Sequence, residues 1–215
     1  MSFSFPSKIF ALAGDGFSPL PLDAQVETLL KAGVRFIQIR STTDNAALLP
    51  VLSAAATLCR AKNAILILHD HPNLARDAQL HGVHLDGDPA RTAQLRGERG
   101  AGFIVGLSVR NAVEWEAAQA CGADYLLIEP IFPSANSPDQ LPAHGVSGLN
   151  RLAARGGLPL AAHGAISRDT LPIVLAAGAG AALVGRAIWK EKNPEAAARA
   201  LLKLAGEGLA LPLAG

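Results

Sequence analysis

The sequence has little cysteine, almost no excess charge of either sign and no long apolar run. Its two cysteines, Cys59 and Cys121, are too few for a disulfide framework. Each lies in an alanine-rich helical stretch, so we expect buried thiols in a reducing cytoplasm. The 19 Lys and Arg residues against 18 Asp and Glu residues leave a net charge of +1. This balance provides no basic surplus to attract nucleic acid and no acidic tail.

Membrane insertion and secretion are not expected either. No apolar run approaches the roughly 20 residues that a membrane-spanning helix needs, and the first residues lack the charged and apolar regions of a signal peptide. Hydrophobic residues make up 50% of the chain and charged residues 17%, which excludes intrinsic disorder. We therefore expect a cytoplasmic globular protein whose partners include neither nucleic acid nor a membrane.

The chain has 215 residues. A usual domain has roughly 150 residues, whereas a single α/β barrel reaches roughly 200–250. No linker, low-complexity segment or charge block suggests a second domain. We predict one domain over residues 1–215.

The apolar pattern alternates between the periods of a strand and of a helix, and each alternation adds a βα unit. The predicted strands are Lys8–Ala13, Phe36–Arg40, Ala64–His69, Gly82–Leu85, Phe103–Leu107, Asp124–Ile128, Pro159–His163 and Ala181–Val184. The predicted helices are Leu22–Ala32, Asn45–Ala61, Pro72–Leu80, Ala90–Leu95, Ala112–Ala120, Val146–Ala154, Ser167–Ala177 and Ala187–Leu204. This alternation predicts a parallel sheet and, at this chain length, a (β/α)8 TIM barrel. An open doubly wound sheet is the alternative.

Punctuation residues support these boundaries. Gly33, Gly122 and Gly178 follow helices, where a left-handed C-cap favours glycine. Asp44, Asn111 and Ser167 stand where helix N-caps belong. The long connection from 129 to 145, between the sixth strand and its helix, is predicted to be functional because loops of this length are uncommon in compact domains.

Polar residues end most of the predicted strands, although the strand interiors are apolar. Chemistry in such barrels sits at the C-terminal ends of the strands. Any one of these residues alone is explained by a solvated rim or by packing, but together they predict a binding site. They are Gln38, Arg40, His69, Asp70, His84, Asp86, Asp88, Ser108, Arg110, Glu129, His163 and Arg186.

Two glycine turns predict a phosphate site. Gly164 and Gly185 follow the last two strands, just before helices. Exposed backbone N–H groups and the helix dipole bind phosphate at such positions. The alternative is that these glycines only permit tight packing of a turn.

Acidic residues at neighbouring strand ends predict Mg²⁺. One or two carboxylates typically hold this ion while phosphates and waters complete its octahedron, and Asp70, Asp86 and Asp88 are the candidates. Basic and hydroxyl groups nearby would bind the remaining phosphate oxygens. The implied chemistry is loss or displacement of a phosphorylated leaving group. Alternatively, the strand-end histidines with Asp86 hold Zn²⁺ in a barrel isomerase.

These motifs, in this order and spacing, resemble the thiamine phosphate synthase family from about Gly33 to Trp189. Residues 38–42 (QIRST) resemble Q-[LI]-R-x-K, His69-Asp70 stands at N-D, and residues 82–89 (GVHLDGDP) resemble G-[VI]-H-[LI]-G-Q-E-D. Residues 106–108 (GLS) match G-[LV]-S. Residues 123–125 (ADY) and 129–134 (EPIFPS) resemble A-D-Y and G-P-[IV]-F-P-T, and residues 162–166 (AHGAI) resemble A-I-G-G-I.

The resemblance implies a transferase of thiamine biosynthesis that joins hydroxymethylpyrimidine diphosphate to thiazole phosphate, gives thiamine phosphate and diphosphate, and uses Mg²⁺. The catalytic residues are Arg40 and Ser108, by carry-over, and Arg110, which is expected to replace a lysine of the family pattern. The substrate-binding residues are Gln38, Arg40, Thr42, His69, Ser108, Ser134, Ala135, Asn136, Ser137, Gly164, Val184 and Gly185. The metal ligands are Asp70 and Asp88, with Asp86 as the alternative second carboxylate. The expected partners are small phosphorylated heterocycles.

The chain also departs from the family pattern. Thr42 and Ser137 replace two lysines, His69 replaces an asparagine, and Pro89 stands at an aspartate position. The lost lysines leave open a catalytically impaired phosphate-binding or regulatory protein. A metal-dependent isomerase or tautomerase is a further alternative, although Pro130 stands where the sister tautomerases have a histidine.

Overall fold

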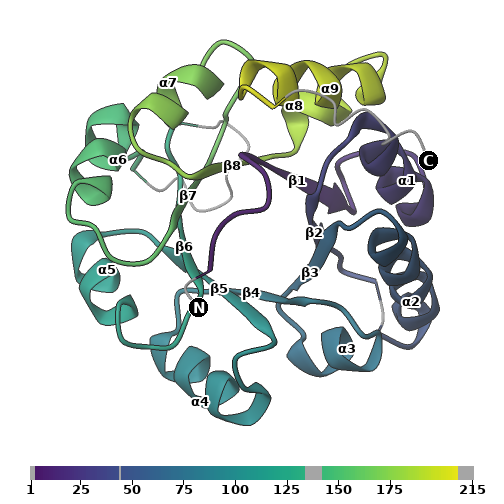
Figure 1. The fold of residues 1–215 in the computed structure, drawn as a ribbon, viewed down its shortest axis with the longest axis horizontal. Coiled ribbons are helices and arrows are strands. Elements are labelled where there is room, and N and C mark those ends of the chain that lie inside the picture. Colours follow the sequence, from purple (N-terminus) through teal and green to yellow (C-terminus); the bar gives the residue numbers. More distant parts are fainter. Residues whose placement is uncertain (1–2, 44, 134–141, 208–215) are drawn as a thin grey trace, which may run out of the picture.

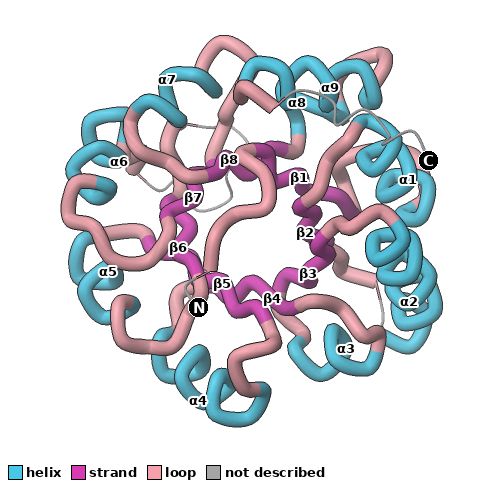
Figure 2. The backbone as a smooth tube through the Cα atoms, viewed as in Figure 1, coloured by secondary structure: helices cyan, strands magenta, loops and turns pink. Residues whose placement is uncertain are grey.

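Eight parallel strands form a closed barrel in the computed structural model, which describes residues 3–43, 45–133 and 142–207. Each strand pairs with the next in the chain, and β8 pairs with β1 to close the ring (Figure 2). The strands are β1 Ile9–Gly14, β2 Phe36–Arg40, β3 Ile65–His69, β4 Gly82–Asp86, β5 Ile104–Val109, β6 Tyr125–Ile128, β7 Leu160–His163 and β8 Ala181–Val184. The predicted TIM barrel is confirmed, and the open sheet is excluded.

Helices surround this barrel and cover the outer faces of the strands (Figure 1). They are α1 Leu22–Ala32, α2 Asn45–Ala61, α3 Pro72–Asp77, α4 Pro89–Arg99, α5 Ala112–Ala118, α6 Gly145–Ala153, α7 Leu171–Ala176, α8 Arg186–Trp189 and α9 Pro194–Leu204. None of the helices in the described ranges is long and apolar enough to span a membrane.

The predicted last helix was wrong, because the segment from 187 to 204 contains a break. It forms α8 and α9, separated by a turn. Asn193 caps α9 through its Oδ1, which accepts a hydrogen bond from the Ala196 N–H at 3.0 Å, and Pro194 follows at the first helical position. A proline there is compatible with a helix start and not with a helix interior.

The predicted caps have mixed outcomes. Asn111 caps α5, with its Oδ1 accepting from two backbone N–H groups, and Gly33 ends α1 at a φ of 100°. The Ser167 prediction was wrong, because α7 begins later and its N-cap is Thr170. Asp44 lies outside the described residues.

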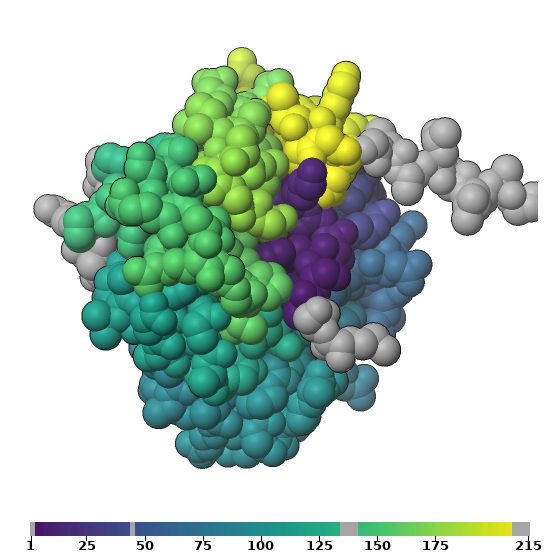
Figure 3. Space-filling view, turned by 60° about the vertical axis from the view of Figure 1, so that its left-hand side comes forward, coloured from purple at the N-terminus to yellow at the C-terminus, as the bar shows by residue number. Residues whose placement is uncertain are grey.

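The core has two layers. Apolar residues between the strands and the helices form the larger one, and the barrel interior holds the smaller one. Inside the barrel, the rings of Phe10 and Phe36 stack with centroids 3.9 Å apart, and Phe3 and Phe5 from the N-terminal segment pack on Phe36. This segment lies against the C-terminal helix (Figure 3), where the Ser7 hydroxyl donates to Glu207 at 2.8 Å. Aromatic packing therefore fills the N-terminal end of the barrel interior.

The two cysteines are both free and buried, as predicted. Burial raises the pKa of the Cys59 thiol to about 12, so the thiol stays protonated at neutral pH. Since reactive cysteines are thiolates, Cys59 is a packing residue.

Candidate active site

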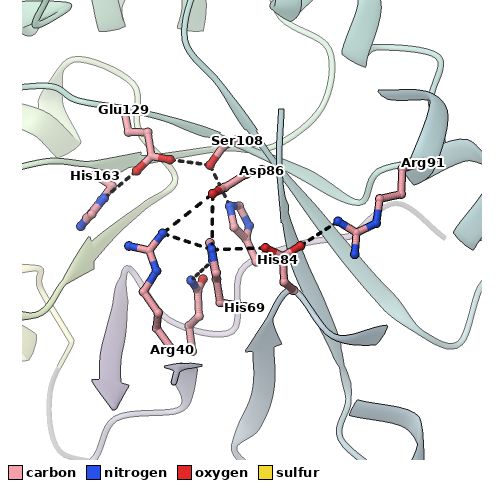
Figure 4. Close-up of polar contacts among 10 residues, drawn as sticks. Arg40, His69, His84, Asp86, Arg91, Ser108, Glu129 and His163 are labelled. Atoms are coloured by element: carbon pink, nitrogen blue, oxygen red, sulfur yellow. Dashed lines mark hydrogen bonds and ion pairs between the residues drawn. The ribbon is translucent and has the colours of Figure 1, made fainter. Parts of the chain in front are cut away.

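Polar side chains gather at the C-terminal ends of the strands in two neighbouring groups (Figure 4). The carboxylate group comes from β2 to β4 and consists of Gln38, Arg40, His69, Asp70 and Asp86, and the relay group comes from β4 to β7 and consists of Tyr125, His84, Ser108, Glu129 and His163. Strand pairing joins the two groups, because Asp86 at the end of β4 is in register with Ser108 on β5. His69 on β3 is likewise in register with His84 on β4.

The carboxylate group is centred on His69. Its Nε2 lies 3.1 Å from Arg40 Nη2 and 3.4 Å from Asp86 Oδ2, and its Nδ1 lies 3.2 Å from Gln38 Nε2. Gln38 and Arg40 are two residues apart on β2, so both side chains point to the same side of the strand. The sequence prediction that these residues meet at one rim is confirmed.

Asp70 and Asp86 supply two carboxylates beside this histidine. One ligand atom from each of His69, Asp70 and Asp86 lies within 4.8 Å of the others. The hydrogen bond with His69 holds the pKa of Asp86 well below its usual range, so its carboxylate is ionised at neutral pH. Arg91 Nη1 lies 2.9 Å from Asp70 Oδ1.

This donor set fits Mg²⁺. Asp86 Oδ1 is buried and has no hydrogen-bond partner among the described residues, which is costly for a carboxylate oxygen unless a cation or a ligand contacts it. Two carboxylates are what Mg²⁺ usually takes from a protein. Asp88 stands apart from them: it caps α4, with its Oδ1 accepting from the Arg91 N–H at 2.9 Å. The structure therefore groups Asp86 with Asp70, which the sequence offered only as the alternative.

The relay group is a continuous chain of hydrogen bonds that begins inside the barrel and ends at its mouth. The Tyr125 hydroxyl lies 3.0 Å from His84 Nδ1, and His84 Nε2 lies 2.9 Å from Ser108 Oγ. Ser108 donates to Glu129 Oε1 at 2.6 Å, and Glu129 Oε2 lies 2.8 Å from His163 Nδ1. Five side chains from four strands are thus joined.

Burial decides the direction of these bonds. It raises the pKa of Tyr125 well above its ordinary value and lowers that of His84 to about 3, so both groups are neutral. Tyr125 then donates to His84 Nδ1, and His84 donates through Nε2 to Ser108. The single Ser108 proton goes to Glu129.

Glu129 is the charged member of the relay. Burial by itself would raise its pKa, but the hydrogen bonds from His163 and Ser108 lower the pKa to about 2. An ionised carboxylate at this position accepts Nδ1–H from His163 and fixes the orientation of the imidazole ring.

Gly106 makes room for the buried half of the relay. A Cβ at this position would lie 2.2 Å from Tyr125 Cζ and 2.6 Å from His84 Nδ1, closer than real Cβ contacts. The first residue of the G-L-S motif therefore lets the two rings pack against β5.

The other predicted site residues lie around these groups. Arg110 reaches the β4–α4 turn, where its Nη1 lies 3.1 Å from the position that a Cβ at Gly87 would take. The Thr42 backbone N–H and hydroxyl both donate to Asp15 Oδ2, at 2.7 Å and 3.2 Å. Val184 is buried at the end of β8. The predictions for Ser134, Ala135, Asn136 and Ser137 lie outside the described residues.

The glycine turns follow β7 and β8 as predicted. Gly164 has a φ of +109°, and a Cβ there would lie 2.8 Å from the backbone nitrogen of Ile131, so no larger residue fits. Gly185 stands immediately before α8. Their phosphate-binding role stays a prediction.

Glu129 and His163 are predicted from the sequence as strand-end polar groups, but their pairing is not. The 34 residues between them hide the contact. The sequence does contain a signal for this pairing. Glu129 directly follows β6 and His163 is the last residue of β7, and the ends of adjacent parallel strands meet at one edge.

Comparison with known proteins decides the family. A family model described as thiamine monophosphate synthase matches residues 13–188. The chain belongs to this family. It is 32% identical over 194 residues to a thiamine-phosphate synthase of Chlorobium luteolum, covering 87% of this chain and 91% of that one. It is 35% identical over 191 residues to that of Salmonella paratyphi B, covering 86% and 89%.

Two further comparisons concern the length of the chain and its fold. The chain spans about half (51%) of a Synechococcus thiamine-phosphate synthase to which it is 33% identical. The solved structure of a thiamine phosphate pyrophosphorylase from Pyrococcus furiosus superposes with a TM-score of 0.84 at 23% identity, covering 93% of this chain and 96% of that one. This likeness shows the fold. The chain is thus thiamine phosphate synthase-like, in a transferase family of thiamine biosynthesis.

Proposed function

We propose that the chain joins hydroxymethylpyrimidine diphosphate to thiazole phosphate and releases diphosphate. The observation that carries this proposal is the carboxylate group, in which the guanidinium of Arg40 lies 3.8 Å from Asp86, and Asp86 is grouped with Asp70. A guanidinium binds phosphate oxygens in a fork, and carboxylates hold the metal that such phosphates require.

Asp70 and Asp86 are the residues that would hold Mg²⁺. When bound, the ion supplies positive charge to a diphosphate leaving group. The unpartnered Oδ1 of Asp86 and the ionised state of its carboxylate support this assignment. Asp88 remains the alternative ligand, although its Oδ1 already caps α4.

Other residues of the chain bind and position the two substrates. Arg40 binds the diphosphate, and Gln38, on the same face of β2, contacts the pyrimidine. Ser108 is fully buried and its proton is committed to Glu129, so its main role is to position that carboxylate. The backbone N–H groups after Gly164 and Gly185 bind the phosphate of the thiazole substrate.

The replaced lysines predict a slow enzyme. Thr42 is held by Asp15, and its hydroxyl carries no charge for the leaving group. Loss of one donor to a developing negative charge costs on the order of 10²–10³ in rate in comparable sites. We therefore expect turnover well below that of relatives that have both lysines.

The test is release of diphosphate by purified protein with both substrates and Mg²⁺. We expect release to stop when thiazole phosphate is omitted or when the metal is chelated. Arg40→Gln should lower the rate at least tenfold. Arg35→Gln is the same substitution just before the start of β2, where the guanidinium donates to the Val34 carbonyl, and it should not change the rate.

Two results would replace the proposal. Absence of turnover while thiamine phosphate still binds would show a regulatory or binding protein on this fold. Stoichiometric Zn²⁺ in the purified protein would support the isomerase alternative.

A further inference from the structure

The relay group ends in a carboxylate–imidazole pair at the barrel mouth that the proposed function has not used. Glu129 Oε2 lies 2.8 Å from His163 Nδ1, and its other oxygen is fixed by the Ser108 hydroxyl at 2.6 Å. Both side chains are partly accessible, with 21% of Glu129 and 26% of His163 exposed. Ser108 therefore fixes the carboxylate of the pair on one side (Figure 4), while both side chains keep some contact with solvent.

Both residues are departures from the family pattern that the sequence resembles. Glu129 stands at the glycine of G-P-[IV]-F-P, and His163 stands at the isoleucine of A-I-G-G-I. Two neighbouring strand ends thus carry a glutamate and a histidine that form one hydrogen-bonded pair. A single solvated rim charge would not need this partner.

The orientation of His163 decides which nitrogen can react. Because Nδ1–H is donated to an ionised carboxylate, the neutral ring carries its lone pair on Nε2. The imidazolium that forms when Nε2 accepts a proton is stabilised by Glu129, as in other carboxylate–imidazole pairs. This geometry is that of a general base.

We propose that His163 is a catalytic base in the transfer reaction and that Glu129 is its positioning residue. The proposal rests on the proposed function. When the C–O bond of the pyrimidine substrate breaks, its electron pair leaves with diphosphate, and the positive charge left on the methylene spreads onto the exocyclic amino nitrogen. That charge acidifies the amino N–H. Nε2 of His163 takes this proton, which leaves a neutral imine with an exocyclic methylene.

The proton then returns. The thiazole nitrogen donates its lone pair to the methylene carbon to form the new N–C bond, the ring electrons move back to the imine nitrogen, and His163 gives the proton to that nitrogen. The product carries the positive charge on the thiazolium, and His163 ends neutral. No oxidant, reductant or further reactant is needed.

This role explains how the chain could react without the two lysines. Breaking the C–O bond creates a cation and an anion, and either half can be stabilised. Thr42 and Ser137 bring no positive charge to the anion, whereas Glu129 and His163 bring a negative charge and a base to the cation. The lysines of the family pattern would stabilise the leaving diphosphate, whereas Glu129 and His163 stabilise the pyrimidine cation.

The experiment compares single-turnover diphosphate release by the wild type, His163→Asn and Glu129→Gln, in H₂O and D₂O. Asparagine keeps an N–H for Glu129 but has no basic nitrogen, so we expect a rate loss of about 10²-fold with little change in the affinity for thiamine phosphate. Glu129→Gln should lose about 10-fold, since the base remains but is no longer oriented by a charge. The wild type should show a solvent isotope effect that His163→Asn lacks.

A matched control is His81→Asn, at the opposite end of the barrel, where the ring accepts from the Leu66 N–H at 3.1 Å and asparagine can do the same. We expect it to keep the wild-type rate. Added imidazole should partly restore His163→Ala, which a packing role would not predict. A wild-type rate in His163→Asn would overturn the role of His163 as the base. A rate loss in His163→Ala that imidazole does not restore would overturn it as well. Either result would leave the proposed function standing. No turnover by the wild type overturns the proposed function as well.

Discussion

Replacing Glu129 with glutamine should remove a measurable, pH-dependent part of the folding stability. Burial works against the ionised carboxylate, but bonds from His163 and Ser108 lower the Glu129 pKa from 4.5 to about 2. A folded-state pKa below the unfolded one means that the unfolded chain binds the proton more tightly. The resulting stabilisation is present above the unfolded pKa and is lost as the pH falls toward the folded one.

The size of this contribution follows from the two pKa values. Between 4.5 and about 2, at about 1.4 kcal/mol for each pH unit, the ionised form contributes about 3 kcal/mol at pH 7. About 2 kcal/mol of this should be lost by pH 3. The side chain is only 21% exposed, so solvent screening reduces the figure little.

The assay is urea unfolding of the wild type and Glu129→Gln at a series of pH values from 7 to 3. The difference in unfolding free energy between the two proteins should shrink by about 2 kcal/mol over this range. Glu116→Gln is the control, because Glu116 pairs with Arg155 on the surface with 67% of its side chain exposed, where such pairs contribute about 0–1 kcal/mol. A difference between wild type and Glu129→Gln that stays constant with pH would refute the reasoning.

Two further comparisons test the packing of the relay group and the metal ligands. Gly106→Ala should destabilise the fold by several kcal/mol, because its Cβ would overlap the Tyr125 ring at 2.2 Å. The control is Gly97→Ala, inside α4 and with nothing within 4 Å of its Cβ, which should stabilise the fold by about 0.5–1 kcal/mol. If urea unfolding gave the same change in stability for both variants, the close packing of Tyr125 against Gly106 would be contradicted. Asp86→Asn should raise the Mg²⁺ concentration for half-maximal diphosphate release at least tenfold. Asp88→Asn should change it less, because its side chain caps a helix, and the reverse order would make Asp88 the ligand.

The barrel was predictable because its elements depend on local patterns. Gly33 is the C-cap of α1 and Asn111 is the N-cap of α5. Both residue types are favoured at those positions, so these two helix ends could be inferred from the residues alone. The error at the C-terminal end has the same local origin. Alanine and leucine run through the segment from 187 to 204, and the Asn193-Pro194 break within it was overlooked.

The membership of the site was also predictable, whereas its pairings were not. Polar residues at strand ends had to meet at one rim once the barrel closed. That Asp86 rather than Asp88 joins Asp70 depends on where β4 ends and α4 begins, since one residue continues the strand and the other caps the helix. A shift of two residues in the loop decides which carboxylate faces the mouth.

By itself, the sequence determined the alternation of strands and helices and the kinds of side chain at the strand ends, because both depend on residue order over short distances. Only the tertiary structure decided which groups are charged and which way their protons point. Ser108 meets a carboxylate from 21 residues away, and that carboxylate meets an imidazole 34 residues further on. Closure of the barrel removes water from His84 and Tyr125 and keeps both neutral. The relay from Tyr125 to His163 exists because strand register and burial act on residues that no local pattern connects.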